Sequence, residues 1–249
     1  MERIKSALCN KTLFGALSVL LVWYILYLTL NTPAIPSPYA AFINFVAIFP
    51  QLWIHLMVSL WRIALAVLIS LILGSIIGLW SGMDRRVDGI VSPIVYILYP
   101  LPKIAFLPIL MILFGLGDTP KVVLIILIII SQFIIAMRDG VKEIPKELFY
   151  SAESLGLSTS QIYRHLIVPA VMPRVISALR IGVGVSISVL FFGENFATTY
   201  GIGYFIMNSW VMASYVDMFS GILALSIIGL VIFKLIDLLD DRLCAWTRL

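Results

Sequence analysis

Charged residues are scarce in this 249-residue chain: Asp, Glu, Lys and Arg make up 12% of it, whereas apolar residues make up 61%. A soluble domain has about 25% charged and 45–50% apolar residues, so this composition excludes an ordinary soluble fold. The 17 Lys and Arg residues are scattered between apolar runs, which excludes the basic stripe of a nucleic-acid-binding surface. The solvent for most of the chain is therefore lipid.

Residues and motifs that carry chemistry are also scarce. The two cysteines, Cys9 and Cys244, lie near opposite ends of the chain and exclude a disulfide-based scaffold. The two histidines, His55 and His165, form no His-Glu-x-x-His pair, and no Gly-x-x-x-x-Gly-Lys-Ser/Thr phosphate loop occurs. We therefore expect no catalytic residues, no metal site and no cofactor bound by this chain itself.

Apolar stretches of about 20 residues recur along the chain and predict an all-α integral membrane protein with about six transmembrane helices. The predicted spans are 12–30, 57–80, 88–114, 121–137, 174–193 and 218–239. The third span contains Pro100 and Pro102, which remove backbone donors, so we expect its second half to be bent or separate. The first span is too long for a signal-peptide core and is predicted to be retained.

The distribution of Lys and Arg predicts the orientation, because cytoplasmic loops retain an excess of these residues. With the N-terminus inside, the only cation assigned to an outer loop is Lys121. The cations assigned to the inner side are Arg3, Lys5, Lys11, Arg85, Arg86, Arg138, Lys142, Lys146, Arg164, Arg174, Arg242 and Arg248. Both termini are therefore predicted to be cytoplasmic. Residues 1–54 are predicted to form a first span with an outer loop at 31–55, and residues 55–249 a core.

Small residues recur at every fourth position of the second span, at Ala66, Ser70, Gly74, Gly78 and Gly82. Such a ridge lets another helix backbone approach closely, which predicts a packing seam. The fifth span repeats the pattern with Ala178, Gly182 and Ser186. The sequence leaves open whether the partner helix belongs to the same chain or to a second copy.

Charges inside the apolar runs require a paired, wet or snorkelling side chain, because a central cation costs about 2.5–3.5 kcal/mol on insertion scales. For Arg62 and Arg180, each taken alone, snorkelling is the favoured interpretation. Glu194, at the outer end of the fifth span, can line a pathway or form a structural ion pair, for which Arg62 is a possible partner. The weaker candidates for pathway or gate residues are Arg62, Pro100, Pro102, Phe191, Glu194 and Asn195.

The predicted inner segment 138–173 is longer than a helix-to-helix turn requires. After Pro145 it predicts a helix that ends at Gly156, and Ser158 or Thr159 can cap a second short helix that Pro169 terminates. A surface-lying amphipathic hairpin is the alternative. Predicted exposed apolar side chains at Leu148, Phe149, Tyr150 and Leu155 favour a protein-docking surface.

This segment carries a resemblance to a known family. Tyr150-Ser151-Ala152, Gly156 and then Leu-Ile-Val-Pro at 166–169 resemble the permease signature Glu-Ala-Ala, three residues, Gly, nine residues, Ile-x-Leu-Pro of binding-protein-dependent ABC importers. The stretches 55–62, 99–108, 114–117 and 201–204 are similar to the nitrate, sulfonate, taurine and bicarbonate branch of these permeases. Tyr150 stands in place of the first signature Glu, so an ion pair of that Glu is not transferred to it.

The resemblance implies a type I ABC importer permease (MetI-like) fold with a coupling helix that docks on an ATPase. The implied ATPase-coupling residues are Tyr150, Ser151, Ala152, Glu153, Leu155, Gly156, Ser158, Arg164, Leu166 and Pro169. The implied partners are a second permease copy, two cytoplasmic ATPase subunits that bind ATP and Mg, and an extracytoplasmic solute-binding protein. The implied cargo is a small anion, and the implied place is the cytoplasmic membrane of a bacterium or archaeon. A secondary carrier or channel without an ATPase is the alternative.

Overall fold

The computed structural model describes residues 2–248, with side chains described from residue 13 to residue 246. The described residues are helical throughout apart from short connections. The helices are α1 (Glu2–Leu30), α2 (Pro38–Ala47), α3 (Phe49–Met83), α4 (Arg85–Leu98), α5 (Leu107–Phe114), α6 (Thr119–Lys142), α7 (Lys146–Ser154), α8 (Thr159–Ile162), α9 (Val168–Gly193), α10 (Ile202–Val211) and α11 (Tyr215–Leu243). A 3₁₀ turn, η1 (Lys103–Phe106), precedes α5, and a π-helical turn, η2 (Tyr163–Ile167), precedes α9.

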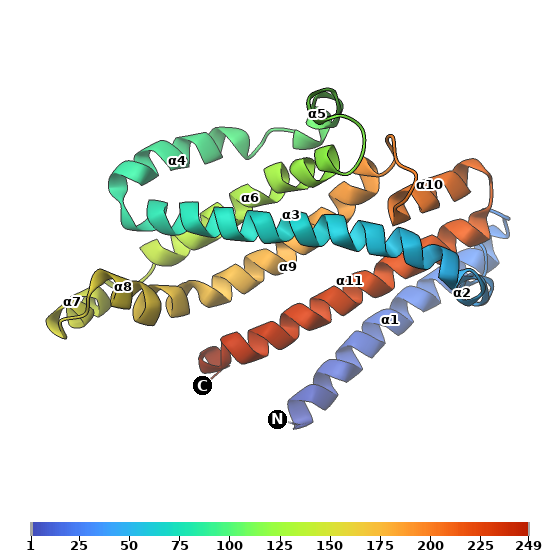
Figure 1. The fold of residues 1–249 in the computed structure, drawn as a ribbon. Coiled ribbons are helices and arrows are strands. Elements are labelled where there is room, and N and C mark those ends of the chain that lie inside the picture. The colour runs from blue at the N-terminus through green and yellow to red at the C-terminus, as the bar shows by residue number, and fades with distance from the viewer. Residues whose placement is uncertain (1, 249) are drawn as a thin grey trace.

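Five helices are long and apolar enough to cross a membrane, and a bent pair makes a sixth span. The prediction of an all-α membrane protein with about six spans is therefore confirmed. Figure 1 shows that α7, α8 and the two chain ends lie toward one end of the bundle, whereas α2 and α10 lie at the opposite end. We call these the inner end and the outer end. The boundary predicted at residue 54 lies inside α3, so the two predicted parts share a helix.

The bent pair is the span that the sequence marked with prolines. The segment 103–114 is inclined by 85° to α4, and Pro100 and Pro102 lie in the break between them. A proline cannot donate a backbone hydrogen bond, so two of them within three residues end the first helix. The predicted bend is confirmed.

The outer loop predicted at 31–55 is wrong over most of its length, because α2 occupies part of it and α3 already begins at Phe49. Pro38 and Pro50 each lie in the first turn of a helix, where the missing N–H costs nothing. Ser37 caps α2, since its Oγ accepts a hydrogen bond from the Ala40 N–H at 3.1 Å. These prolines begin helices rather than interrupt them.

The ridge of small residues on α3 packs against α6 of the same chain. A Cβ atom added to Gly78 would lie 2.6 Å from the Ile134 carbonyl oxygen, and one added to Gly82 would lie 2.6 Å from Val141 Cβ. Real Cβ atoms do not approach so closely, so only glycine permits this spacing. The partner that the sequence left open is therefore within the chain. The second ridge faces the same helix, because Gly182 lies opposite the Phe133 ring.

Candidate functional site

The inner end carries a helical hairpin formed by α7 and α8. Gly156 ends α7 in the left-handed region with φ of 73°, and its N–H donates to the Glu153 carbonyl at 2.9 Å. Ser158 caps α8 in a capping box, in which the Ser158 N–H donates to Gln161 Oε1 at 2.8 Å. The predicted helix, turn and second helix start are therefore present, and each end is held by a local hydrogen bond.

The hairpin presents an apolar outer face. Leu148, Tyr150 and Leu155 are exposed, and Leu155 keeps 79% of its surface accessible. Ala152 and Ile162 face inward and pack with Ile167 at the inner end of the core. Phe149 was predicted to be exposed, but it is half-buried against this cluster.

The remaining predicted coupling residues divide between the surface and the base of the hairpin. The exposed ones are Ser151, Glu153, Gly156, Ser158 and Arg164, and the half-buried ones are Leu166 and Pro169. The Tyr150 side chain points to solvent, consistent with its having no inherited ion-pair partner. Ser151 donates its hydroxyl to the Glu147 carbonyl at 2.8 Å, within its own helix.

Pro169 does not terminate the second helix, which corrects the sequence prediction. Residues 159–193 run as one apolar helical path, and the turn before Pro169 is π-helical. The Val168 N–H donates to the Tyr163 carbonyl five residues earlier. This wider turn accommodates a proline in a continuing helix, because it relieves the clash with the carbonyl four residues before it. The hairpin is thus joined directly to the long helix α9.

The outer end contains a buried charge network centred on Arg62. Arg62 Nη1 lies 2.5 Å from Glu194 Oε1, and Arg62 Nη2 lies 2.5 Å from Asp118 Oδ1. The Arg62 and Glu194 side chains are 4% and 0% exposed, whereas Asp118 is 56% exposed. The pairing of Arg62 with Glu194 agrees with the partner named from the sequence. The snorkelling interpretation of Arg62 is wrong, because its guanidinium is neutralised inside the fold.

Glu194 is the point where several segments meet. Its carboxylate accepts from Ser59 Oγ at 2.7 Å and from the Gly203 N–H at 2.8 Å, besides Arg62. An added Cβ at Gly201 would lie 2.5 Å from Glu194 Oε1, so this loop approaches the carboxylate as only glycine can. Arg62 Nη1 also donates to the Tyr200 carbonyl at 2.9 Å. The network therefore holds α3, the end of α9 and the loop before α10 together.

Sequence reasoning missed Ser59, Asp118, His55 and Lys121 as members of this region. His55, Ser59 and Arg62 lie four and three residues apart, so the helical period could have placed them on one face of α3. Lys121 was assigned to an outer loop, but it is buried in α6 and donates to the Gly117 carbonyl at 2.8 Å. Asp118 has no such signal, because its partner lies 56 residues earlier.

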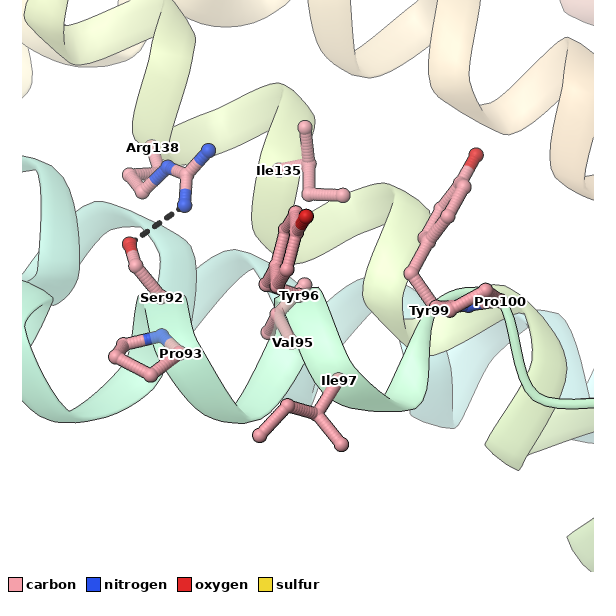
Figure 2. Close-up of a pocket in the computed structure, with 9 residues that line it drawn as sticks. All are labelled: Ser92, Pro93, Val95, Tyr96, Ile97, Tyr99, Pro100, Ile135 and Arg138. Atoms are coloured by element: carbon pink, nitrogen blue, oxygen red, sulfur yellow. Dashed lines mark hydrogen bonds between the residues drawn. The ribbon is translucent and has the colours of Figure 1, made fainter.

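The other predicted pathway residues do not form one site. Phe191 is half-buried beside Gly203, and the Asn195 Oδ1 atom is buried and unbonded among the described residues. Pro102 is exposed at the start of η1. Pro100 lines a cavity of about 870 Å³ between α4 and α6. Figure 2 shows Tyr96 of α4 and Tyr99, which follows that helix, on the side of Ile135 in this cavity, with Arg138 bonded to Ser92.

Arg180, also predicted to snorkel when taken alone, pairs with Asp237 of α11 at 2.6 Å. This pair joins the middle of α9 to α11. The snorkelling interpretation is therefore replaced by an ion pair between two spans, since a carboxylate neighbour lowers the cost of a cation in the membrane.

Comparison with known proteins identifies the class to which this bundle belongs. The family model for the inner membrane component of binding-protein-dependent transport systems matches residues 70–248. The chain therefore belongs to this family and is the permease subunit of an ABC importer. This membership replaces the alternative of a carrier or channel that works alone.

Individual relatives cover nearly the whole chain. The taurine transport system permease protein TauC of Escherichia coli (strain K12) is 33% identical over 242 residues, which cover 93% of this chain and 88% of that protein. The formylaminopyrimidine transport permease protein ThiX of Halalkalibacterium halodurans is 28% identical and covers 100% of this chain and 99% of that protein. SsuC of Bacillus subtilis (strain 168), named for aliphatic sulfonates transport, is 26% identical over 87% of this chain and 79% of that protein.

Solved structures show the same fold. The inward-facing MetNI methionine ABC transporter superposes with a TM-score of 0.61 and 19% identity, covering 78% of this chain and 98% of that chain. The type I, MetI-like permease fold implied by the sequence is therefore confirmed.

Proposed function

We propose that this permease imports small organic sulfonates across the cytoplasmic membrane of a bacterium or archaeon. The observation that carries the solute class is the 33% identity to a taurine permease over 93% of the chain. The second relative named for sulfonates supports the same class. The sulfonate group of such a solute is anionic, in keeping with the branch that the motifs resemble, and specificity is shared with a solute-binding protein that delivers the solute.

The energy for import comes from an ATPase that docks on the α7–α8 hairpin. Three apolar side chains of this hairpin, Leu148, Tyr150 and Leu155, face away from the bundle, and a hairpin without a partner would not need them. The chain itself has no phosphate loop, so ATP and Mg are bound by two cytoplasmic ATPase subunits. Two permease copies complete the complex and enclose the pathway between them.

Uptake into proteoliposomes tests the solute class. The permease is reconstituted with its ATPase and solute-binding protein and given taurine, ethanesulfonate, nitrate, bicarbonate or a formylaminopyrimidine in parallel. We expect ATP-dependent uptake of the two sulfonates and little uptake of the others. Uptake of a formylaminopyrimidine alone would contradict the solute class, and sulfonate uptake without the ATPase would contradict the energy source.

Substitution of Gly156 tests the docking hairpin. An added Cβ would meet nothing within 4 Å, so a replacement acts through the backbone φ of 73° rather than through a clash. A left-handed conformation costs an L-residue about 1–2 kcal/mol, and Asn tolerates it best. We expect Gly156→Leu to retain ATP hydrolysis but lose uptake, and Gly156→Asn to remain coupled. Gly89→Leu on the exposed face of α4, where an added Cβ also meets nothing within 4 Å, is the control.

Equal coupling in the Gly156→Leu and Gly156→Asn variants would contradict a role for the hairpin turn in transmission. Loss of the permease from the membrane in both would instead identify the turn as a folding element.

A further inference from the structure

An ammonium group lies in the middle of the membrane-spanning region, in the break between α4 and α5. Lys103 belongs to η1, and its Nζ donates to Ser131 Oγ at 3.2 Å. Ser131 is the thirteenth residue of α6, which runs from Thr119 to Lys142. At 1.5 Å per residue it is about 18 Å from the outer end of that helix, close to the centre of a hydrocarbon core of about 30 Å.

This cation has no ion-pair partner in the part of the chain that the structure describes. Arg62 and Arg180 each face a carboxylate within 2.6 Å, and Lys121 near the outer end of α6 donates to two backbone carbonyls. Lys103, at the middle of the span, donates to a hydroxyl. A cation at this depth is unfavourable by about 2.5–3.5 kcal/mol on insertion scales unless it is paired or meets water. Such a residue is retained for a function, and the broken backbone around it is tolerated only beside protein or a water-filled cavity.

A second polar side chain at the same depth also lacks a partner. The Gln132 Oε1 atom is buried and has no hydrogen bond to any described residue. Gln132 and Lys103 line the same cavity, of about 360 Å³, together with Tyr99. We call this the Lys103 cavity. Its volume lies in the range of about 300–1,000 Å³ of small-molecule sites. The unbonded Oε1 is an acceptor, so the donors that this cavity offers to an anion are the Lys103 ammonium, the Gln132 amide NH₂ and the Tyr99 hydroxyl.

The Lys103 cavity adjoins two others toward the inner end. Gln132 and Tyr99 also line a cavity of about 310 Å³ with Arg174, and Tyr99 lines the cavity of Figure 2 with Arg138. Each cavity thus contains one cation, but Arg174 pairs with Glu143 and Arg138 pairs with Asp139, so among the described residues Lys103 is the lining cation that has no ion pair. A cleft lined by one sign of charge concentrates ions of the other sign.

We propose that the Lys103 cavity binds the anionic group of a small organic solute on its way across the membrane. The proposal rests on sulfonate import as the function and assigns Lys103 and Gln132 as solute-contacting residues. The acidic headgroup of a lipid has the same charge, but the depth of Ser131 favours a free solute, because headgroups lie at the membrane surface.

Charge-selective labelling tests the cavity without depending on transport. The Gln132→Cys variant is prepared with Cys9 and Cys244 replaced by serine. In the complex with its ATPase and solute-binding protein, it is treated with an anionic sulfonatoethyl or a cationic trimethylammonioethyl thiosulfonate. The rate of each reagent is divided by its rate with a free thiol. We expect this relative rate to be at least about tenfold higher for the anionic reagent than for the cationic one, because a cleft lined by one sign of charge raises counter-ion encounter rates by about 10–10³.

Matched variants locate the origin of this preference. Adding Lys103→Gln should abolish it, and Lys103→Arg should restore it. Lys234→Gln removes an exposed lysine of α11 that lines none of these cavities, and it should leave the preference unchanged. Equal rates for the two reagents, or a preference that survives Lys103→Gln, would overturn the proposal. The proposal would also be overturned if the preference were present in vesicles of pure phosphatidylcholine but lost in vesicles that contain phosphatidylglycerol. An anionic lipid would then occupy the site.

Taurine uptake by the Lys103→Gln complex separates this proposal from the proposed function. We expect a maximal uptake rate at least tenfold below that of the parent complex, with a smaller loss for Lys103→Arg and unchanged co-purification of the ATPase. Normal sulfonate uptake by Lys103→Gln would overturn the assignment of Lys103 alone. Charge-selective labelling in a complex that transports no sulfonate would refute only the solute class.

Discussion

The buried pair of Arg62 and Glu194 predicts an energetic coupling that can be measured. Arg62→Met leaves a carboxylate that is 0% exposed with two remaining donors, Ser59 and Gly203. Removing one partner of a buried ion pair typically costs about 3–5 kcal/mol, because the other charge stays desolvated. Glu194→Gln keeps the shape and leaves Arg62 paired with Asp118, so its cost should be about 1–3 kcal/mol, that of one unsatisfied buried group.

The double variant should cost less than the sum of the single variants by more than about 1 kcal/mol, because no buried charge is then left unpaired. The free energy of unfolding is measured in mixed detergent micelles from tryptophan fluorescence. Lys142→Met is the control, since Lys142 pairs with Asp88 at the inner end and is 44% exposed. Partly exposed pairs contribute about 0–1 kcal/mol.

Additive costs, or an Arg62→Met cost no larger than that of Lys142→Met, would refute the argument for a buried pair. The same variants also decide between the two roles considered for Glu194. If the pair only stabilises the outer end, solute uptake per folded complex should be unchanged in Glu194→Gln. A loss of uptake without a comparable loss of stability would identify Glu194 as a gate residue.

Two further predictions concern the glycines that set close approaches. Gly78→Ala should destabilise the permease by about 1–3 kcal/mol in the same unfolding assay, since its Cβ would overlap the Ile134 carbonyl, whereas Gly89→Ala should be neutral or slightly stabilising. Gly201→Ala should expel the loop before α10 from Glu194 and raise protease cleavage of that loop, and unchanged cleavage would show that the loop does not depend on this approach.

The spans could be predicted from the sequence because hydropathy over about 20 residues records the solvent directly. Their ends could not, since a helix continues into polar residues wherever its backbone groups need partners: α6 extends to Lys142, and α3 begins before His55. The short helix α2 was missed because residues 31–55 were assigned to an outer loop, although Pro38 begins a helix there. Whether a proline begins or interrupts a helix depends on its position in the first turn, which hydropathy does not report.

The sites were predictable to the extent that their residues lie on one helix or carry one motif. The turn at Gly156 and the cap at Ser158 are local features, and both were found. Arg62 and Glu194 were paired because both lie toward the outer end. Asp118 acquires its role only when α3 packs against the start of α6, and Lys103 acquires its role only when η1 packs against the middle of α6. A charge whose partner lies far along the chain, or whose partner is a ligand, leaves no periodic signal.

Helix α6 connects the charge network at Arg62, the Lys103 cavity and the α7–α8 hairpin. Its outer end begins after Asp118, its middle faces Lys103 through Ser131, and its inner end leads into the hairpin through Glu143, which pairs with Arg174. The glycine seam holds α6 against α3 so closely that the two cannot slide without displacing backbone, because packed interiors are not continuously deformable. Because Arg62 lies on α3 and Asp118 lies at the start of α6, a displacement of the hairpin that moves α6 carries this pair together and acts instead on the contacts of α3 with Glu194 at the end of α9.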